Sequence, residues 1–381
     1  MSFDELNELV ARCGGGPSGH GPAITLDAPR HQTGNVVGVT ATPRPDWIQA
    51  NPVTIKNALR RSQGKPSGGW FVLGASRNFG RSFRVHATAR IPLAHGESGL
   101  LGPWRETIAD QELVVWRTTR NGPLHAAPAA CPHMGAHLAG GSVRDGCLVC
   151  PWHGLALDGP HGHWRQLPVY DDGVLSWVQL DPADPGSLGA PILAKRPDVF
   201  LDGVIRVDAT CEPEDVIANR LDPWHGAHFH PYAFTALRVI DEADHAIDLV
   251  VSYKVVGKYS VEVTARFETP DPRTIVMTII DGEGTGSVVE THATPITTAG
   301  PHRAPRTAVI EATLATSDRP GFSYALRGAR MARPIIKMSA ARLWNDDARY
   351  AERRYQQRSH APSDTPSDTP SDTPSDNHSQ P

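Results

Sequence analysis

The chain has 381 residues, among them 37 basic and 41 acidic side chains, and its formal net charge at pH 7 is −4. This balance argues against a nucleic-acid partner and against attachment to an anionic membrane surface. The length allows two domains of ordinary size, each with a buried core. The sequence contains no apolar run of about 18 residues, so we expect no membrane span.

The cysteines favour a reducing compartment. They are odd in number and cluster in one part of the chain, which argues against a disulfide framework. The opening stretch MSFDELNELVARCGGG is acidic and lacks the basic start and apolar core of a secretory signal. We therefore expect a cytoplasmic protein with reduced thiols at Cys13, Cys131, Cys147, Cys150 and Cys211.

The first half of the chain predicts an extension followed by a small β domain. Residues 1–67 are rich in glycine, proline and charge, and the amphipathic stretch 52–62 predicts a short helix packed on the body or on a partner. From 68 to 182, short apolar runs alternate with Gly, Pro and Asp, which is typical of an all-β domain. An Asn-Gly pair inside residues 112–126 predicts a hairpin there.

Two cysteines and two histidines form a paired arrangement inside this β domain. Cys131-Pro-His133 is followed by residues 134–149 and then by Cys150-Pro-Trp-His153. Thiolates bind iron–sulfur clusters, and imidazoles that replace two of them raise the reduction potential. In such a cluster Cys131 and Cys150 would hold one iron, and His133 and His153 would hold the other.

This spacing, C-P-H and then C-P-W-H-G, resembles the Rieske [2Fe–2S] motif, and the flanking β pattern extends the resemblance over roughly residues 68–182. Rieske proteins of respiratory complexes carry an additional cysteine beside each ligand pair. Ala136 and Trp152 stand at those positions here. The chain therefore resembles the Rieske oxygenases and their ferredoxins, whose clusters have lower potentials.

A zinc site is the alternative for the same residues. Cys147 and Cys150 form a C-x-x-C pair, which with Cys131 and His133 would supply four zinc ligands. That arrangement leaves His153 and the CPWHG signature without a role. We expect Cys147 to be a small buried residue on the strand that enters the second loop.

The second half predicts an antiparallel sheet closed by a helix. After a linker over 181–191, five strand-like runs follow, several with alternating apolar and polar residues. They cover 246–256, 259–269, 273–281, 286–296 and 306–316, and a helical pattern covers 332–358. We assign a second domain to 190–358 and treat 359–381, with its Ser-Asp-Thr-Pro repeats, as a disordered tail. The fold class is α+β, and the resemblance implies a helix-grip-like sheet over a long C-terminal helix.

A second group of polar residues lies at 219–230. Two neutral imidazoles and one carboxylate on one face of Fe(II) leave positions open for dioxygen and substrate. The pattern N-x-x-D-x-x-H-x4-H resembles the mononuclear-iron motif of Rieske oxygenase α-subunits, which implies that His225 and His230 are iron ligands. It also implies that Asp222 bridges to the cluster histidine of a neighbouring subunit and that Asn219 supports the ligands. His228 is left as a pocket residue.

The carboxylate has to come from elsewhere, and Asp346 and Asp347 are the candidates. Helical spacing puts Asp347 on a stripe of otherwise apolar residues, namely Ile336, Ala340, Leu343 and Ala351. Asp346 falls on the polar face, where a solvated ion pair is expected. A carboxylate on a buried stripe is costly unless it is paired or binds a metal. We therefore predict Asp347 as the ligand, with a salt bridge to an arginine as its alternative role.

Together these features predict a terminal oxygenase that resembles the monooxygenase branch of the Rieske non-haem iron oxygenases. The chain shows no nicotinamide or flavin motif, so electrons would come from an external NAD(P)H-dependent reductase, directly or through a ferredoxin. O2 and a hydrophobic small molecule would be the substrates, and the resemblance implies a head-to-tail homotrimer. The alternative is a Rieske electron carrier whose second domain binds a ligand without catalysis.

Overall fold

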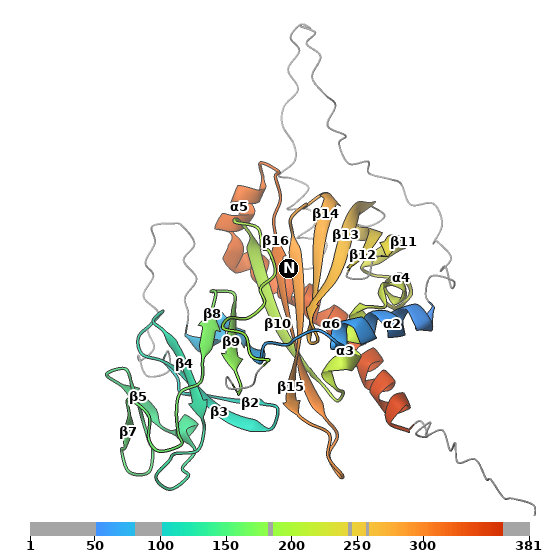
Figure 1. The fold of residues 1–381 in the computed structure, drawn as a ribbon. Helices are drawn as coiled ribbons and strands as arrows, with labels where there is room; N and C mark the ends of the chain where they lie inside the picture. Colours follow the sequence, from blue (N-terminus) through green and yellow to red (C-terminus); the bar gives the residue numbers. More distant parts are fainter. Residues whose placement is uncertain (1–50, 81–100, 182–185, 243–245, 257–258, 361–381) are drawn as a thin grey trace, which may run out of the picture.

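The computed structural model describes residues 51–80, 101–181, 186–242, 246–256 and 259–360. These residues form two lobes that lie side by side (Figure 1). The first lobe consists of three small antiparallel sheets, and the second is one large sheet packed against helices. This arrangement confirms the predicted α+β fold, with a small β domain followed by an antiparallel sheet and a C-terminal helix. Among the described helices, none is long and apolar enough to cross a membrane.

The first lobe is built from short strands joined by tight turns. Its three sheets have the strand orders β1-β9-β8, β2-β3-β4 and β5-β6-β7. The predicted hairpin is the β3–β4 pair, in which Asn121 takes a positive φ of 60° at the turn. The bounds are β1 Trp70–Ala75, β2 Trp104–Ile108, β3 Gln111–Arg117, β4 Leu124–Pro128, β5 Ser142–Arg144, β6 Cys147–Val149, β7 Ala156–Leu157, β8 Val169–Asp171 and β9 Leu175–Gln179, with 3-10 turns η1 Ser76–Phe79 and η3 Leu138–Gly140.

The second lobe is a seven-stranded antiparallel sheet in the order β10-β16-β15-β14-β13-β12-β11. Alternation along the strands gives the sheet two apolar faces: one packs on the helices and the other packs, near β10 and β16, on the first lobe. The bounds are β10 Leu201–Ala209, β11 Phe234–Glu242, β12 Ala246–Val256, β13 Tyr259–Asp271, β14 Thr274–Gly282, β15 Val288–Thr297 and β16 Arg306–Ala315.

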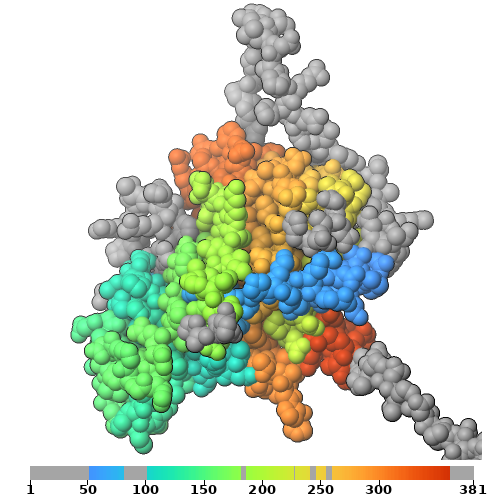
Figure 2. Space-filling model, in the orientation of Figure 1, coloured from blue at the N-terminus to red at the C-terminus, as the bar shows by residue number. Residues whose placement is uncertain are grey.

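The helices cover the inner face of this sheet. Helix α6 (Ala329–His360) is the longest and packs along β10, with α3 (Pro213–Arg220) beside it. Helix α2 (Pro52–Gln63) lies across the surface of the second lobe, as the blue segment in Figure 2 shows, and buries Ala58 and Leu59 in the same core. The remaining helices are the turn η4 (Pro223–His225), α4 (Gly226–Phe229) and α5 (Phe322–Arg327).

Helix α6 approaches strand β10 unusually closely at Gly203. A Cβ atom at that position would lie 2.5 Å from Cγ2 of Ile336. Only a residue without a side chain therefore allows the helix to cross there. This contact fixes how α6 lies on the sheet, and so how its later residues face α3 and α4.

A buried ionic network joins the two lobes. Arg196, in the segment that connects them, binds Glu290 of β15 with two hydrogen bonds and also pairs with Asp172 in the β8–β9 turn. Glu290 contacts His292 as well, at 3.3 Å, and the ring of Trp177 lies 6.3 Å from that of His292. This network therefore links the connecting segment, the first lobe and the second lobe.

Several details differ from the sequence-based expectation. Strands β10 and β11 were not among the predicted runs. Helix α6 begins three residues earlier than the predicted 332 and continues to His360, so the first two residues of the predicted tail, Ser359 and His360, are helical. The rest of that tail lies outside the described residues, as does most of the predicted N-terminal extension. The helix predicted over 52–62 packs on the body of the protein.

Candidate metal centres

The two Cys-His loops of the first lobe have the same backbone turn. In the first, the Gly135 N–H donates to the Cys131 carbonyl (2.8 Å), and Gly135 has a φ of 74°. In the second, the Gly154 N–H donates to the Cys150 carbonyl (3.1 Å), and Gly154 has a φ of 68°. The positive φ explains why each motif carries a glycine four residues after its cysteine. The repeated turn presents the two motifs to each other.

These loops bring the two thiols together beneath two exposed imidazoles. Cys131 and Cys150 are each 3% exposed, while the His133 and His153 rings are solvent-exposed with centroids 4.8 Å apart. Burial raises the pKa of Cys131, and its neighbour Cys150 adds to that effect. Burial also opposes ionisation of Cys150, but the N–H groups of Trp152 and His153 and the Cys131 thiol lower its pKa. Backbone N–H groups directed at buried sulfur suit an anionic iron–sulfur cluster.

Cys147 lies apart from this pair. It is on β6, half-buried, and its Sγ faces the backbone carbonyl of Asp145 at 3.9 Å. The structure therefore leaves it as a strand residue beside the loops, more exposed than predicted. It contributes no contact of the kind that the zinc alternative requires.

The second lobe brings His225, His230 and Asp347 together. Asp347 Oδ1 lies 3.1 Å from His225 Nε2 and 2.8 Å from His230 Nε2. The ligand atoms of the three residues lie within 4.8 Å of one another, and no other group of three or more His, Cys, Asp or Glu in the described residues meets that criterion. Two imidazoles and one carboxylate converging in this way fit a mononuclear iron site. The alternative role considered for Asp347, a salt bridge to an arginine, is not what its contacts with the described residues show, since both ion pairs are with histidines.

Local structure explains how histidines five positions apart converge. Pro223 starts the short turn η4, and α4 adds a single helical turn before the chain leaves helical geometry at His230, whose φ is −120° and ψ is 55°. The break rotates His230 back toward His225, which a straight helix would not allow at this spacing. Asp347 reaches both from the buried face of α6, where it is 3% exposed.

The charges in this group reinforce one another. Burial alone would raise the pKa of Asp347, but hydrogen bonds and charge from His225 and His230 hold it well below its usual range. Burial alone would lower the pKa of His225, but Asp347 and then Asp222 raise it. A divalent metal bound here would replace the protons that lie between Asp347 and the two Nε2 atoms, because it requires an ionised carboxylate and neutral imidazoles.

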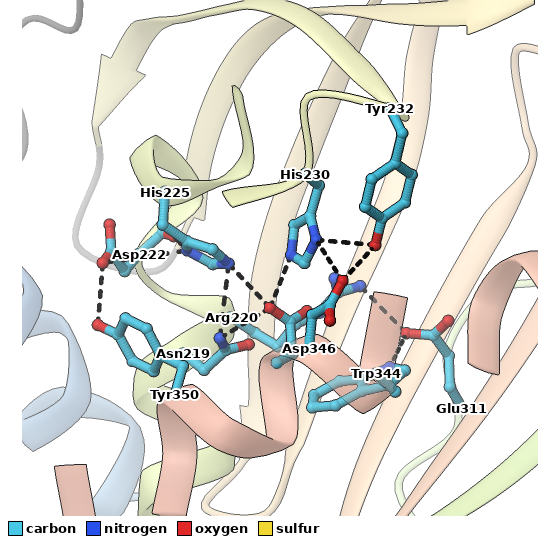
Figure 3. A network of polar contacts seen from close by, with 11 residues as sticks. Asn219, Arg220, Asp222, His225, His230, Tyr232, Glu311, Trp344, Asp346 and Tyr350 are labelled. Carbon is cyan, nitrogen blue, oxygen red and sulfur yellow. Dashed lines mark hydrogen bonds and ion pairs between the residues drawn. The ribbon is translucent and has the colours of Figure 1, made fainter. Parts of the chain in front are cut away.

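Asn219 and Asp222 flank the group. Asn219 is fully buried at the end of α3, and its Nδ2 lies 3.2 Å from Asp347 Oδ1 and 3.5 Å from His225 Nε2. The Asp222 backbone carbonyl accepts from His225 Nδ1, while its side chain accepts a 2.9 Å hydrogen bond from the Tyr350 hydroxyl. Each of the two histidines therefore has its second ring nitrogen occupied, by Asp222 and by Tyr232 (Figure 3). This leaves both Nε2 atoms facing Asp347.

Asp346 has a different environment from the solvated ion pair that we predicted. Its Oδ2 accepts a 2.7 Å hydrogen bond from the Tyr232 hydroxyl and lies 3.9 Å from His230 Nδ1. It is half-buried because the loop after α4 folds back over this part of α6, which helical spacing alone does not reveal. His228 is exposed and makes none of these contacts.

Sequence patterns missed several residues of this network. Tyr232 and Tyr350 contact the group through their hydroxyls, and aromatic residues gave no signal of a polar role. A third missed residue is Glu311, which accepts a hydrogen bond from Trp344 Nε1 (2.6 Å) and forms an ion pair with Arg220 (3.4 Å). This contact ties α3 and α6 to strand β16. In the sequence, a glutamate at an inward-facing strand position indicates such a contact, because a buried carboxylate needs a partner.

Comparison with known proteins identifies the domain type of the first lobe and relatives of part of the chain. The profile of the Rieske [2Fe-2S] domain matches residues 93–177, and a domain of unknown function (DUF5914) matches residues 183–362. Dicamba O-demethylase, oxygenase component, of Stenotrophomonas maltophilia is 32% identical over 149 residues, which are 34% of this chain and 42% of that protein. Cholesterol 7-desaturase nvd of Hemicentrotus pulcherrimus is 33% identical over 91 residues, 23% of this chain and 19% of that protein. The matched segments thus span less than half of either relative.

The fold has a counterpart among solved structures. Dicamba monooxygenase bound to dicamba superposes with a TM-score of 0.52 at 19% identity, over 77% of this chain and 88% of that one. The first lobe is therefore a Rieske domain, the kind that binds a [2Fe–2S] cluster. Over the segment matched in sequence the chain is homologous to the oxygenase component of dicamba O-demethylase, and its fold resembles that of dicamba monooxygenase over 77% of its length.

Proposed function

We propose that this protein is the terminal oxygenase of a Rieske-type system. It would use O2 and electrons from an external NAD(P)H-dependent reductase, directly or through a ferredoxin, to hydroxylate, dihydroxylate or dealkylate a hydrophobic small molecule. The observation that carries the proposal is the presence in one chain of a Rieske domain and of the converging group His225, His230 and Asp347.

In this proposal each metal has its own residues. Cys131 and Cys150 hold one iron of the cluster, and His133 and His153 hold the other. His225, His230 and Asp347 hold the mononuclear Fe(II), which supplies open positions for dioxygen and substrate. Asn219 keeps Asp347 Oδ1 turned toward the two histidines. The carbonyl of Asp222 keeps the proton of His225 on Nδ1.

Electron delivery to the cluster requires a surface on which a redox partner can bind. The two cluster imidazoles are exposed at the loop tips, so a partner can approach them directly. In Figure 1 these loops, beside β5 and β7, lie at the far end of the first lobe from α3, α4 and α6. This separation supports a head-to-tail homotrimer in which Asp222 bridges to the cluster histidine of a neighbouring subunit. The four described cysteines are free, which supports a reducing cytoplasm.

Aromatic rings beside the metal group support a hydrophobic substrate. The ring centroids of Phe229 and Phe234 lie 5.2 and 6.2 Å from that of His230. The names of two relatives point the same way, since one is the oxygenase component of an O-demethylase and the other acts on cholesterol. A small apolar or aromatic molecule that carries a C–H or O-methyl group is the substrate class we infer.

The test is substrate-dependent oxygen uptake. Purified full-length protein with a surrogate reductase is screened against aromatic, steroid-like and isoprenoid compounds, and product is identified by mass spectrometry. Asp347→Ala should abolish product while preserving the visible spectrum of the cluster. Glu352→Gln, on the same helix, is the matched control, because Glu352 binds the Thr210 N–H and not the metal group. Product formation by Asp347→Ala would contradict the assignment.

A further inference from the structure

The second ring nitrogen of His230 begins a short polar chain. His230 Nδ1 lies 3.2 Å from the Tyr232 hydroxyl, which lies 2.7 Å from Asp346 Oδ2. His230 is 2% exposed, while Tyr232 and Asp346 are half-buried. In Figure 3 Tyr232 stands beside His230, and Asp346 closes the chain from α6.

The direction of this chain is fixed by the chemistry of its members. An ionised carboxylate only accepts hydrogen bonds, so the Tyr232 O–H must donate to Asp346. The lone pairs of the Tyr232 oxygen then face His230 and can accept only from a protonated Nδ1. With one proton held on Nδ1, the Nε2 atom presents its lone pair to a metal once the proton between it and Asp347 is lost.

A second contact fixes the tyrosine ring. The guanidinium of Arg342, one helical turn before Asp346, lies 3.8 Å from the centre of the Tyr232 ring. Helix α6 therefore holds Tyr232 at two points, through its face and through its hydroxyl. The same helix carries Asp347. One rigid element therefore positions the ligand Asp347 and also holds Tyr232, which contacts the ligand His230.

We propose that Tyr232 and Asp346 form a positioning relay, in which the His230 Nδ1–H donates to Tyr232 and Tyr232 donates to Asp346, so that Nε2 of His230 is held ready for the metal. The proposal rests on the function proposed above, because it takes His230 as a metal ligand. Neither residue touches the metal or the substrate. Removal of such supporting groups typically weakens metal binding about 10- to 100-fold.

The experiment measures Fe(II) affinity of the full chain under anaerobic conditions, by competition with a chelator. Tyr232→Phe keeps the ring under Arg342 and removes only the hydroxyl, and Asp346→Ala removes the final acceptor. We expect each variant to bind Fe(II) at least about tenfold more weakly, and the double variant to lose little more than the worse single variant, because the two residues act in series. Tyr324→Phe, at an exposed tyrosine of α5, is the matched control.

An EPR measurement distinguishes a change in the position of His230 from a general loss of protein stability. The nitric oxide adduct of the Fe(II) site gives an EPR signal that reports ligand geometry, while the oxidised cluster is silent. We expect altered rhombicity in Tyr232→Phe and the unaltered signal in Tyr324→Phe, with equal thermal stability and equal cluster absorbance in both.

The outcomes distinguish the two proposals. If His230→Ala binds Fe(II) as well as the unmodified protein does, the proposed function itself is wrong. If His230→Ala loses Fe(II) but Tyr232→Phe stays within twofold of the unmodified protein with the same EPR signal, only the relay is wrong. The relay is also wrong if the fold losses of Fe(II) affinity in the two single variants multiply fully in the double variant.

Discussion

Replacement of Glu290 by Gln should weaken the ionic network between the two lobes and so lower the free energy of unfolding. Glu290 is 1% exposed and binds Arg196 through both carboxylate oxygens, one of them at 2.8 Å. Gln keeps the size of the side chain but removes its charge. Arg196 then keeps only Asp172 as an ionic partner, at the place where the connecting segment meets both lobes.

The magnitude follows from the pKa of Glu290. Burial raises this pKa, but Arg196 and His292 outweigh burial and lower it from 4.5 to about 2. At about 1.4 kcal/mol per pKa unit, the interaction contributes about 3 kcal/mol to the free energy of unfolding near pH 7. Loss of one partner from a buried ion pair typically costs about 3–5 kcal/mol. The lower end is expected here because Asp172 remains.

The same pKa sets the pH dependence. The unfolded chain binds a proton at Glu290 near pH 4.5, while the folded chain does so only near pH 2. The stabilisation is therefore complete above about pH 5.5 and is lost as the pH falls from 4.5 toward 2. The difference between the unmodified protein and Glu290→Gln should shrink as the pH falls below about 4.5.

Urea unfolding followed by tryptophan fluorescence measures this difference, since Trp177 lies beside both Arg196 and His292. Glu268→Gln, at an exposed position of β13, is the control and should change the free energy by less than about 0.5 kcal/mol. A loss below about 1 kcal/mol in Glu290→Gln, or a difference that does not change with pH, would refute this account of the joint.

Three further predictions concern packing and the metal centres. Gly203→Ala should lower stability by about 1–3 kcal/mol, because its Cβ would meet Ile336 at 2.5 Å; thermal unfolding measures this, and an unchanged midpoint would contradict the close crossing. Asp222→Asn should keep a reducible cluster and a filled iron site but slow electron transfer between them, so normal single-turnover kinetics would argue against the bridge. Cys131→Ser should remove the cluster absorbance and leave the mononuclear iron, so iron should fall from about three to about one per chain; a retained cluster spectrum would exclude Cys131 as a ligand.

Features with a local periodic signature were predictable from the sequence. All five strand-like runs of the second half appear as strands, and the helical stripe that singled out Asp347 is the face of α6 that meets the histidines. The reason is that alternation and 3.6-residue periodicity report burial directly. The Rieske motif was equally clear, because its spacing is set by a turn that repeats in both loops.

Strand β10 shows what the sequence concealed. Its segment contains Gly203, which weakens a strand pattern but is needed where α6 crosses, and Asp202, which is fully buried and paired with Arg333 at 2.8 Å. Glycine and aspartate in a strand usually indicate a turn, so the pattern favoured a loop. Tertiary contacts that lie outside the segment override that preference.

The relay residues were hidden for a different reason. Tyr232 and Asp346 are separated by 114 positions in the chain, and their pairing depends on how the loop after α4 folds onto α6. Helical spacing correctly separated Asp346 from Asp347, but it could not reveal what would cover the polar side. Contacts of this kind become visible only when the elements are assembled.

The most direct test of the central claim is the metal content of the full-length protein as purified under anaerobic conditions. The account predicts about three iron atoms and about two acid-labile sulfides per chain, and about two iron atoms in Asp347→Ala with the sulfide unchanged. A colourless protein that contains zinc would contradict the assignment of both centres. About two iron atoms in the unmodified, reconstituted protein would instead indicate an electron carrier without a catalytic iron.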